Sequence, residues 1–349
     1  MAHDTDVLIA GGGLNGAALA LALAKGGVSV TIVDPAPVKI RKRPGFDGRS
    51  YAMAVASKRM MAALGLWADL EKNAQPILEI KVSDGKPGQG ASPFVLEFDH
   101  AELEEGPMGW MVEDRYLRPA LLTALEGQKN ITRLDGISVS DHAANTSGVT
   151  VTLSNGELVT AACLIGADGR ESKCRDRAGI GRVAWGYGQT ALVCAIDHEL
   201  EHRGVAHQFF MPSGPLAMLP LQGKKSSIVW TESTQEAERI NALGDDAYLD
   251  VLRPRFGSFL GQISLAGARY TYPLGLTLAH HFVGERLALI GDAAHGVHPI
   301  AGQGLNAGLR DVAALAEVLV EARRRGEDIG RGEVLQRYQL WRRFDATAL

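Results

Sequence analysis

The stretch that decides the fold is DVLIAGGGLNGAALALALAKGGVSVTIVD, which runs from Asp6 to Asp34. It predicts a strand over Asp6–Ala10, a tight glycine turn, a helix of small residues over Leu14–Lys25 and a second strand over Val28–Val33. Runs of Val, Ile and Thr in both strands are typical of a buried parallel sheet. The chain is therefore expected to begin with a βαβ unit of an α/β fold.

The turn of this unit has the spacing Gly11-x-Gly13-x-x-Gly16, and Asp34 ends the second strand. Glycines there permit the tight turn, a close approach of a diphosphate and packing of helix on strand. The helix N-terminus offers unpaired N–H groups to the diphosphate, and an acid at the strand end can accept hydrogen bonds from a ribose. We predict a dinucleotide site formed by Gly11, Gly13, Leu14, Asn15, Gly16 and Asp34.

Two later motifs follow buried strands in the same way. CLIGADGRES places Asp168-Gly169 after a strand, although a plain Asp-Gly turn explains these residues equally well. LIGDAAHGVHPIAGQGLNAGLRD places Asp292 where a strand ends, the usual position of the ligand crevice in an open α/β sheet. A carboxylate at that point can bind a polyol such as a ribityl chain.

Composition narrows the class of protein. The 349 residues carry a net charge of −4, which gives no electrostatic reason to expect nucleic acid, and the short cluster Arg41-Lys42-Arg43 is expected to be solvated. Three cysteines without CxxC spacing favour neither zinc nor a disulfide framework. The start MAHDTD is acidic, which argues against a signal peptide. The uncharged run Val7–Ala24 contains the glycine turn, so no membrane span is predicted.

The order of the predicted elements indicates a discontinuous arrangement. We predict an FAD-binding domain from residues 1–75, 108–182 and 272–349, and a substrate-binding domain from residues 76–107 and 183–271. A helix is expected from Ala52 to about Leu70. Four apolar residues of the second domain, Phe209, Met211, Met218 and Trp230, are expected either to line a substrate pocket or to lie in the core.

Taken together, these motifs resemble the single-component FAD-dependent aromatic hydroxylases of the p-hydroxybenzoate hydroxylase type. DGRSYAMAVAS, YGQTALV, GPLAMLPL, SIVWTES and RLALIGDAAHGVHPIAGQGLNAGLRDVAALAEVL further resemble the ubiquinone-biosynthesis hydroxylases, with the 2-octaprenyl-6-methoxyphenol hydroxylase branch nearest. The match covers nearly the whole chain. It implies a Rossmann-like FAD/NAD(P)-binding domain with an inserted α+β substrate domain.

The resemblance also implies roles for single residues. Gly11, Gly13 and Gly16 would hold the FAD pyrophosphate, and Asp34, where the family more often has Glu, would hold the adenosine ribose. Arg49 and Arg115 would approach FAD, Asp168 would order the pyrophosphate region, and Asp292 would bind ribityl or phosphate oxygens. Backbone N–H groups of Gly302, Gly304, Leu305 and Asn306 would face the flavin N1–C2=O edge, with His298 and Pro299 near the flavin face.

The implied reaction is hydroxylation of a polyprenylated phenol in ubiquinone biosynthesis, in which reduced flavin captures dioxygen as a C4a-hydroperoxide. NAD(P)H is the expected electron donor, with a ferredoxin-type donor as the alternative. A cytoplasmic protein with peripheral contact at the inner face of the membrane is expected, and a quinone-biosynthesis complex or an oligomer is possible. The alternatives are hydroxylation of another aromatic substrate and a non-catalytic FAD-binding scaffold.

His295 and His298 have H-x-x-H spacing, which on a helix is typical of metal ligands. Pro299 and the surrounding glycines argue against a regular helix there, and no third ligand is evident in the sequence. We therefore expect no metal site and favour packing or hydrogen bonding beside the flavin. A role for His298 as general base toward the phenol stays open.

Overall fold

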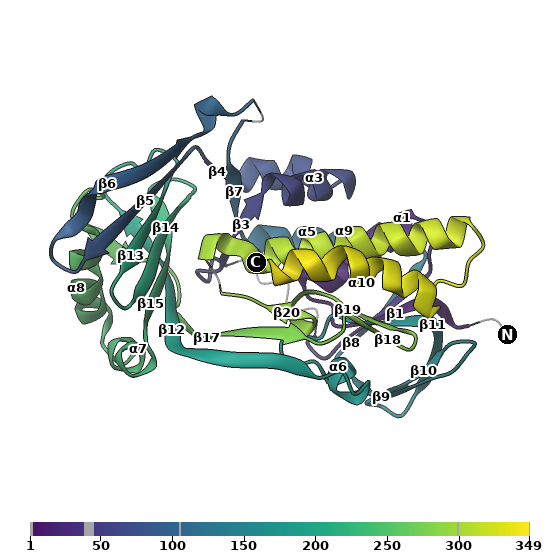
Figure 1. Ribbon diagram of the computed structural model, residues 1–349. Helices are drawn as coiled ribbons and strands as arrows, with labels where there is room; N and C mark the ends of the chain where they lie inside the picture. Colours follow the sequence, from purple (N-terminus) through teal and green to yellow (C-terminus); the bar gives the residue numbers. More distant parts are fainter. Residues whose placement is uncertain (1–2, 38–44, 105, 299, 349) are drawn as a thin grey trace.

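The structure is a computed structural model that describes residues 3–37, 45–104, 106–298 and 300–348. The predicted cluster Arg41-Lys42-Arg43 and the predicted site residue Pro299 lie outside these residues. Two large sheets occupy opposite ends of the molecule (Figure 1). The first of them is covered by the helices α1 (Leu14–Lys25), α9 (Gln303–Arg324) and α10 (Gly332–Thr347).

The first sheet is the predicted parallel sheet. Its central strands run in the order β19-β11-β1-β2-β8, and every neighbouring pair among them is parallel. The bounds of these strands are Thr5–Ala10 for β1, Val30–Asp34 for β2, Ile131–Asp135 for β8, Leu158–Gly166 for β11 and Leu287–Leu289 for β19. The second strand thus begins two residues later than predicted. An antiparallel extension, β9 (Val139–Ala144) and β10 (Val149–Leu153), continues from β11.

Helix α1 (Leu14–Lys25) has the predicted bounds and packs against α5 (Asp114–Glu126) and α9 (Gln303–Arg324). Its alanines and leucines are almost all buried, because the helix is enclosed by the sheet on one side and by two helices on the others. Within the described ranges no helix is both long enough and apolar enough to span a membrane.

The β1–α1 turn depends on two glycines that differ sharply from the third. A Cβ on Gly16 would lie 1.9 Å from the carbonyl oxygen of Gly11, so helix and turn can approach this closely only without a side chain. Gly11 has φ +107° and would bring a Cβ to 2.3 Å from the carbonyl oxygen of Ala167 on the neighbouring loop. Gly13, in contrast, has no atom within 4 Å of its Cβ position.

The helix predicted from Ala52 to about Leu70 is wrong at its start, and it is interrupted between Ala63 and Trp67. Ala52 lies in β3 (Ser50–Ala54), which pairs with β7 (Gly109–Glu113) in a three-stranded sheet completed by β4 (Gln75–Ile77). The backbone N–H and C=O groups of β3 are satisfied by pairing with β7. This long-range pairing cannot be seen in the local helical spacing of the sequence. The helix proper, α3, runs from Val55 to Ala63, and α4 (Trp67–Leu70) follows after Gly65 at φ +80°.

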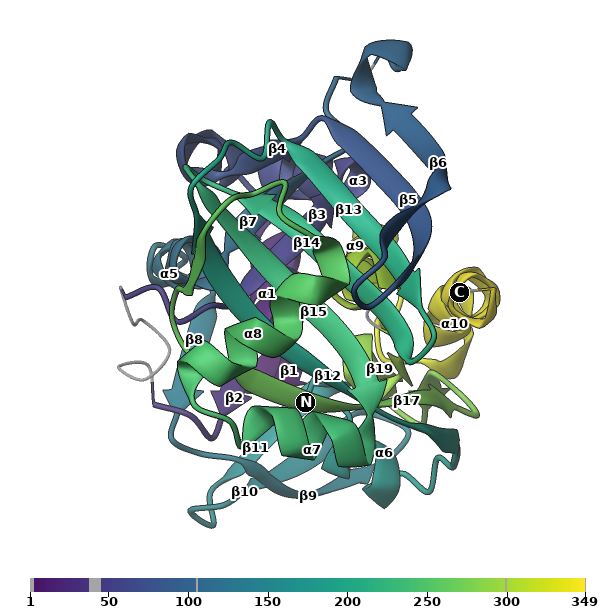
Figure 2. The ribbon, with the colours of Figure 1, turned by 90° about the vertical axis from the view of Figure 1, so that its left-hand side faces the viewer.

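The second sheet has the strand order β20-β17-β12-β15-β14-β13-β5-β6. The bounds are Glu79–Lys86 for β5, Gly90–Asp99 for β6, Arg182–His198 for β12, Val205–Met211 for β13, Gly214–Leu221 for β14, Lys225–Ser233 for β15, Tyr270–Ala279 for β17 and His295–Gly296 for β20. Helices α7 (Thr234–Asn241) and α8 (Asp245–Phe256) cover one face (Figure 2). Phe209, Met211, Met218 and Trp230 are buried in the core beneath them.

Strands β12 and β17 extend from the first half of the molecule into the second (Figure 1). They pair along most of their length, with a register shift between Gly186 and Thr190. The predicted domain boundaries at 182/183 and 271/272 fall within these strands, and the division into two domains stays a prediction.

The contrast between two glycines of the first turn predicts different effects of the same substitution. Gly16→Ala should lower the free energy of unfolding of the FAD-free protein by about 1–3 kcal/mol, because the new methyl group collides with backbone. Gly13→Ala is the matched control and should change it by less than about 1 kcal/mol. Urea unfolding of both variants measures this, and equal destabilisation would contradict the packing described.

Candidate functional site

A cavity of about 1000 Å³ lies where β3, the turn after β19, the start of α9 and the second sheet meet. Its lining includes six of the residues predicted from sequence: Arg49, Asp292, Gly302, Gly304, Leu305 and Asn306. The remaining predicted residues with described positions do not line it: Gly11, Gly13, Leu14, Asn15, Gly16, Asp34, Arg115, Asp168 and His298. The structure thus brings the late motif to the cavity and leaves the early glycine turn outside its walls.

The start of α9 offers backbone N–H groups to the cavity. Gly302 precedes the helix with φ +63°, a conformation that favours glycine, and no side chain caps the helix. A Cβ there would also lie 2.8 Å from the Cβ of Ala52. The uncapped first turn carries the positive end of a 22-residue helix, so it favours a negatively charged or electron-rich group in the cavity.

The side chain of Asn306 has a structural task that sequence reasoning missed. Its Oδ1 accepts hydrogen bonds from the backbone N–H of Ala54 at 2.9 Å and from the hydroxyl of Ser57 at 2.6 Å. Its Nδ2 donates to the carbonyl oxygens of Ala52 and Gly302, each at 2.8 Å. The side chain therefore holds the β3–α3 junction against α9, which leaves only the backbone of Asn306 for the predicted contact.

Asp292 stands in a short turn that is anchored by a buried carboxylate. Asp311, on α9 and 0% exposed, accepts hydrogen bonds at Oδ2 from the backbone N–H of Gly291 at 2.9 Å and from Nε2 of His295 at 2.6 Å. Its Oδ1 pairs with Nε of Arg342 at 2.8 Å, which comes from α10 (Gly332–Thr347). Asp311 was not predicted. The available signal was an acid between the apolar helix positions of the late motif.

The two histidines of the H-x-x-H pattern have separate surroundings. His295 is buried against Asp311, whereas the ring of His298 lies 5.8 Å from that of Tyr187, centre to centre, and its Nδ1 accepts from the N–H of Ile300 at 3.3 Å. Burial lowers the pKa of His298, so its ring is neutral at pH 7. It lines a smaller pocket beside Gln208, and its predicted place near the flavin face stays a prediction. Among the described residues no three His, Cys, Asp or Glu side chains group as metal ligands.

The early glycine turn is held from two sides. Asp34 is buried, and its carboxylate accepts from the N–H of Gly12 at 2.6 Å and from that of Ala36 at 2.8 Å. The side-chain amide of Asn15 fills the space left by two glycines, since a Cβ on Gly308 would lie 2.2 Å from its Nδ2 and one on Gly291 2.4 Å. Asn15 thereby joins the start of α1 to the Asp292 turn and to α9.

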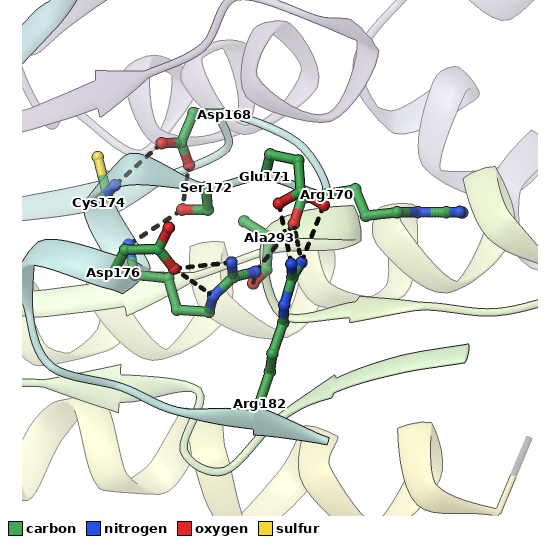
Figure 3. A network of polar contacts seen from close by, with 9 residues as sticks. Asp168, Arg170, Glu171, Ser172, Cys174, Asp176, Arg182 and Ala293 are labelled. Atoms are coloured by element: carbon green, nitrogen blue, oxygen red, sulfur yellow. Dashed lines mark hydrogen bonds and ion pairs between the residues drawn. The ribbon is translucent and has the colours of Figure 1, made fainter. Parts of the chain in front are cut away.

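Asp168 also acts within its own loop (Figure 3). Its carboxylate accepts from the hydroxyl of Ser172 at 2.5 Å and from the N–H of Cys174 at 3.0 Å, at the start of α6 (Lys173–Arg177). Arg175 donates to the carbonyl oxygen of Ala293 at 3.4 Å, which ties this loop to the Asp292 turn. These contacts order the loop that contains Asp168, and its role at the pyrophosphate stays a prediction. The side chain of Arg170, which sequence reasoning missed, points away from the network and lines the cavity.

The two predicted arginines separate. Arg49 lines the cavity, where it pairs with Asp47 at 2.6 Å and lies 3.4 Å from Asp114. The hydrogen bond from Arg49 to Asp47 raises the pKa of the guanidinium above its usual value. Arg115 pairs with Glu113 at 2.6 Å and stacks on Phe46 outside the lining.

The far side of the cavity is largely apolar. It is formed by the face of the second sheet opposite α7 and α8, and sequence reasoning missed it because both faces of this sheet carry apolar residues. The side chains concerned are Ile80, Val82, Ala191, Val193, Ala206, Phe210, Ala217, Leu219 and Val229. Gln208, Ser227 and Tyr272 are polar exceptions. One end of the cavity therefore suits an electron-rich, hydroxyl-bearing group, and the other suits an apolar molecule.

The buried Asp311 network predicts a large loss of stability when its charge is removed. Asp311→Asn should lower the free energy of unfolding by about 3–5 kcal/mol, because Arg342 then loses its buried ionic partner and the Gly291 N–H and His295 lose a charged acceptor. Asp345→Asn is the matched control, since Asp345 is a half-exposed partner of the same arginine, and it should cost less than about 1 kcal/mol. Chemical denaturation measures both, and similar losses would contradict a central role for Asp311.

The residues at the first end of the cavity fit a flavin. An uncapped helix start, closely approaching glycine backbone and the carboxylate of Asp292 match the pyrimidine edge and polyol of FAD. Comparison with known proteins agrees. Residues 4–348 match the family described as FAD binding domain.

Similar proteins extend over almost the whole chain. A ubiquinone hydroxylase, UbiL, of Rhodospirillum rubrum is 47% identical over 97% of this chain and 78% of its own length. The 3-demethoxyubiquinol 3-hydroxylase of Escherichia coli is 36% identical over 98% and 86%.

Among solved structures, Pseudomonas aeruginosa PqsL in complex with 2-aminobenzoylacetate has a TM-score of 0.79 at 23% identity, covering 99% of this chain and 93% of its own. The p-nitrophenol 4-monooxygenase PnpA of Pseudomonas putida has a TM-score of 0.80 at 21% identity over 98% and 85%. These likenesses agree with the predicted p-hydroxybenzoate hydroxylase-like fold. The chain belongs to the FAD-binding-domain family of FAD-dependent monooxygenases, together with the ubiquinone hydroxylases.

Proposed function

We propose that this monooxygenase hydroxylates the aromatic ring of a prenylated phenol in ubiquinone biosynthesis, using FAD, dioxygen and a reduced donor. The observation that carries the proposal is a single cavity with a helix N-terminus and Asp292 at one end and an apolar sheet face at the other. The printed names of the relatives, ubiquinone hydroxylase and 3-demethoxyubiquinol 3-hydroxylase, support this substrate class. The choice of the 2-octaprenyl-6-methoxyphenol hydroxylase branch stays a prediction.

At the cofactor end, the chain supplies position and electrostatics. When bound, FAD supplies the redox chemistry that activates dioxygen. Backbone N–H groups at Gly302–Asn306 favour negative charge on the flavin ring, and Asp292 accepts hydrogen bonds from the polyol chain. Gly13 leaves room beside the start of α1 for the diphosphate, and Arg49, which is held by its ion pair with Asp47, lines the cavity.

At the substrate end, the chain excludes water and orients the ring. The apolar sheet face surrounds the phenol with hydrocarbon, which removes water that would compete with the transfer of oxygen. Tyr272 lines the cavity, and its hydroxyl, uncharged at pH 7 as in any ordinary tyrosine, can donate a hydrogen bond to the phenol oxygen. Gln208 and Ser227 are the further polar side chains on this wall.

The described residues do not favour covalent catalysis by cysteine. All three thiols are buried, and burial raises the pKa of Cys163 to about 12 and that of Cys194 to about 11. Burial likewise raises the pKa of Cys174. The thiolate is the nucleophilic form, so these side chains are inert at pH 7.

NAD(P)H is the proposed donor, with a ferredoxin-type reductant as the alternative. A prenylated phenol partitions into lipid, so we also propose that the protein acts in the cytoplasm with peripheral contact at the inner face of the membrane. A complex with other quinone-biosynthesis proteins would likewise bring the lipid-soluble phenol to this protein.

The reaction predicts incorporation of one atom from dioxygen into the ring. FAD-reconstituted protein given NAD(P)H and a prenylated phenol under ¹⁸O₂ should yield a product heavier by one labelled oxygen, and mass spectrometry measures it. A non-prenylated aromatic acid is the substrate control. Protein that binds FAD but labels no phenol with either donor would contradict the proposal and favour a scaffold, whereas preferred labelling of the acid would indicate a different aromatic substrate.

The proposed cofactor contacts predict an order of effects on FAD affinity. Asp292→Ala should weaken FAD binding about tenfold or more, because a charged hydrogen-bond acceptor is lost. His298→Ala should weaken it by less than about threefold, since His298 lies outside the main cavity. Titration followed by flavin fluorescence measures both, and the reverse order would overturn these assignments.

A further inference from the structure

The edge strand β6 carries an exposed apolar face. Leu96 and Phe98 are two residues apart in the regular part of the strand and therefore point to the same side, and Phe94 lies just before them at the register shift of the β5–β6 pair. Phe94, Leu96 and Phe98 are 87%, 58% and 43% exposed. We name these three residues the β6 stripe. Glu97 and Asp99 point to the other side. The usual pattern of an exposed edge, with charged residues breaking up apolar ones, is thus absent from the stripe itself.

The β6 stripe continues the apolar wall of the cavity. In the antiparallel pair β5–β6, Phe98 lies opposite Ile80 and Leu96 lies opposite Val82. Directly opposed side chains share one face of a sheet, and both Ile80 and Val82 line the cavity. Apolar side chains therefore continue from the cavity lining on β5 to β6. Strand β6 is the last strand of the sheet on this side (Figure 2).

At the mouth of the cavity, β13, the strand beside β5, also carries an exposed aromatic side chain. Phe210 lines the cavity yet is itself exposed, and it lies beside Asp84 of β5, one strand away from β6. An apolar molecule that reaches this mouth thus meets aromatic side chains on both β13 and β6.

The charges around the β6 stripe restrict what can occupy it. Glu97, Asp99 and Glu102 lie on or directly after the strand. Lys81 of β5 pairs with Glu97 at 3.1 Å, so acidic side chains outnumber the basic partner. Acidic groups are repelled by an anionic membrane surface, and two copies of this edge would bring like charges together. An uncharged hydrocarbon chain meets neither penalty.

We propose that the β6 stripe binds the isoprenoid tail of the substrate where that tail leaves the cavity. This inference rests on the proposed function. The cavity has to hold the flavin ring and the phenol together, so a tail of several isoprene units continues beyond it. From Phe94 to Phe98 the strand spans roughly 13 Å, which extends the apolar path well outside the cavity.

The test compares affinity with tail length. FAD-loaded wild-type protein and the variant Phe94→Thr/Leu96→Thr/Phe98→Thr are titrated with phenols bearing one to six isoprene units, and the change in flavin absorbance reports binding. Threonine keeps β propensity in the strand. Wild-type affinity should rise with each added unit, and the triple variant should bind the longest phenol about tenfold more weakly while binding the shortest one equally well.

Val95→Thr is the matched control, because Val95 is exposed on the opposite face of the same strand, and it should behave as wild type. Equal dependence on tail length in wild type and triple variant would overturn the inference alone. If the triple variant also lost binding to vesicles, the stripe would be assigned to contact with a bilayer. If its oligomeric state changed, the stripe would be assigned to contact with a second copy of the chain. A wild type that binds no prenylated phenol would overturn the proposed function as well.

Discussion

One buried carboxylate determines how the parts of this site meet. Asp311 is out of contact with solvent, and its partners come from the Asp292 turn, from β20 and from α10. A carboxylate in such a place is unfavourable unless it is fully paired, so the three segments must stay together for the protein to remain folded. The position of Asp292 relative to the start of α9 is thereby coupled to the packing of the last described helix.

Backbone proximity does as much for the site as side chains do. Asn15 fits between Gly291 and Gly308, and Gly16 lies against Gly11, because none of these glycines has a side chain to keep the segments apart. The cofactor end is therefore a rigid arrangement of backbone N–H groups. Such preorganised dipoles stabilise charge without having to reorient when it develops.

The sequence predicted the parts of the fold whose signals are local. The bounds of α1 follow from glycine spacing and small residues. The positions of Asp34 at the end of β2 and of Asp292 after β19 follow from short apolar runs. The task of Asn306 was out of reach, since its partner Ser57 is 249 residues away in the chain. Helical spacing after Ala52 misled for the same reason, because its strand partner lies in β7.

The sequence likewise did not show which face of the second sheet lines the cavity. Strand β14 carries apolar residues on both sides, so alternation shows that Met218 and Leu219 are separated but not which of them faces the cavity. Only the packing of α7 and α8 on the Met218 side resolves it.

The paired strands β12 and β17 restrict how the substrate sheet can be exchanged between related enzymes. Both run unbroken from beside the cofactor end into the substrate sheet, and their ladder contains one register shift, between Gly186 and Thr190. A chimaera that exchanges the substrate sheet between relatives must cut both strands at the same rung and on the same side of that shift. A one-residue error would turn every following side chain to the opposite face, and the apolar wall would leave the cavity.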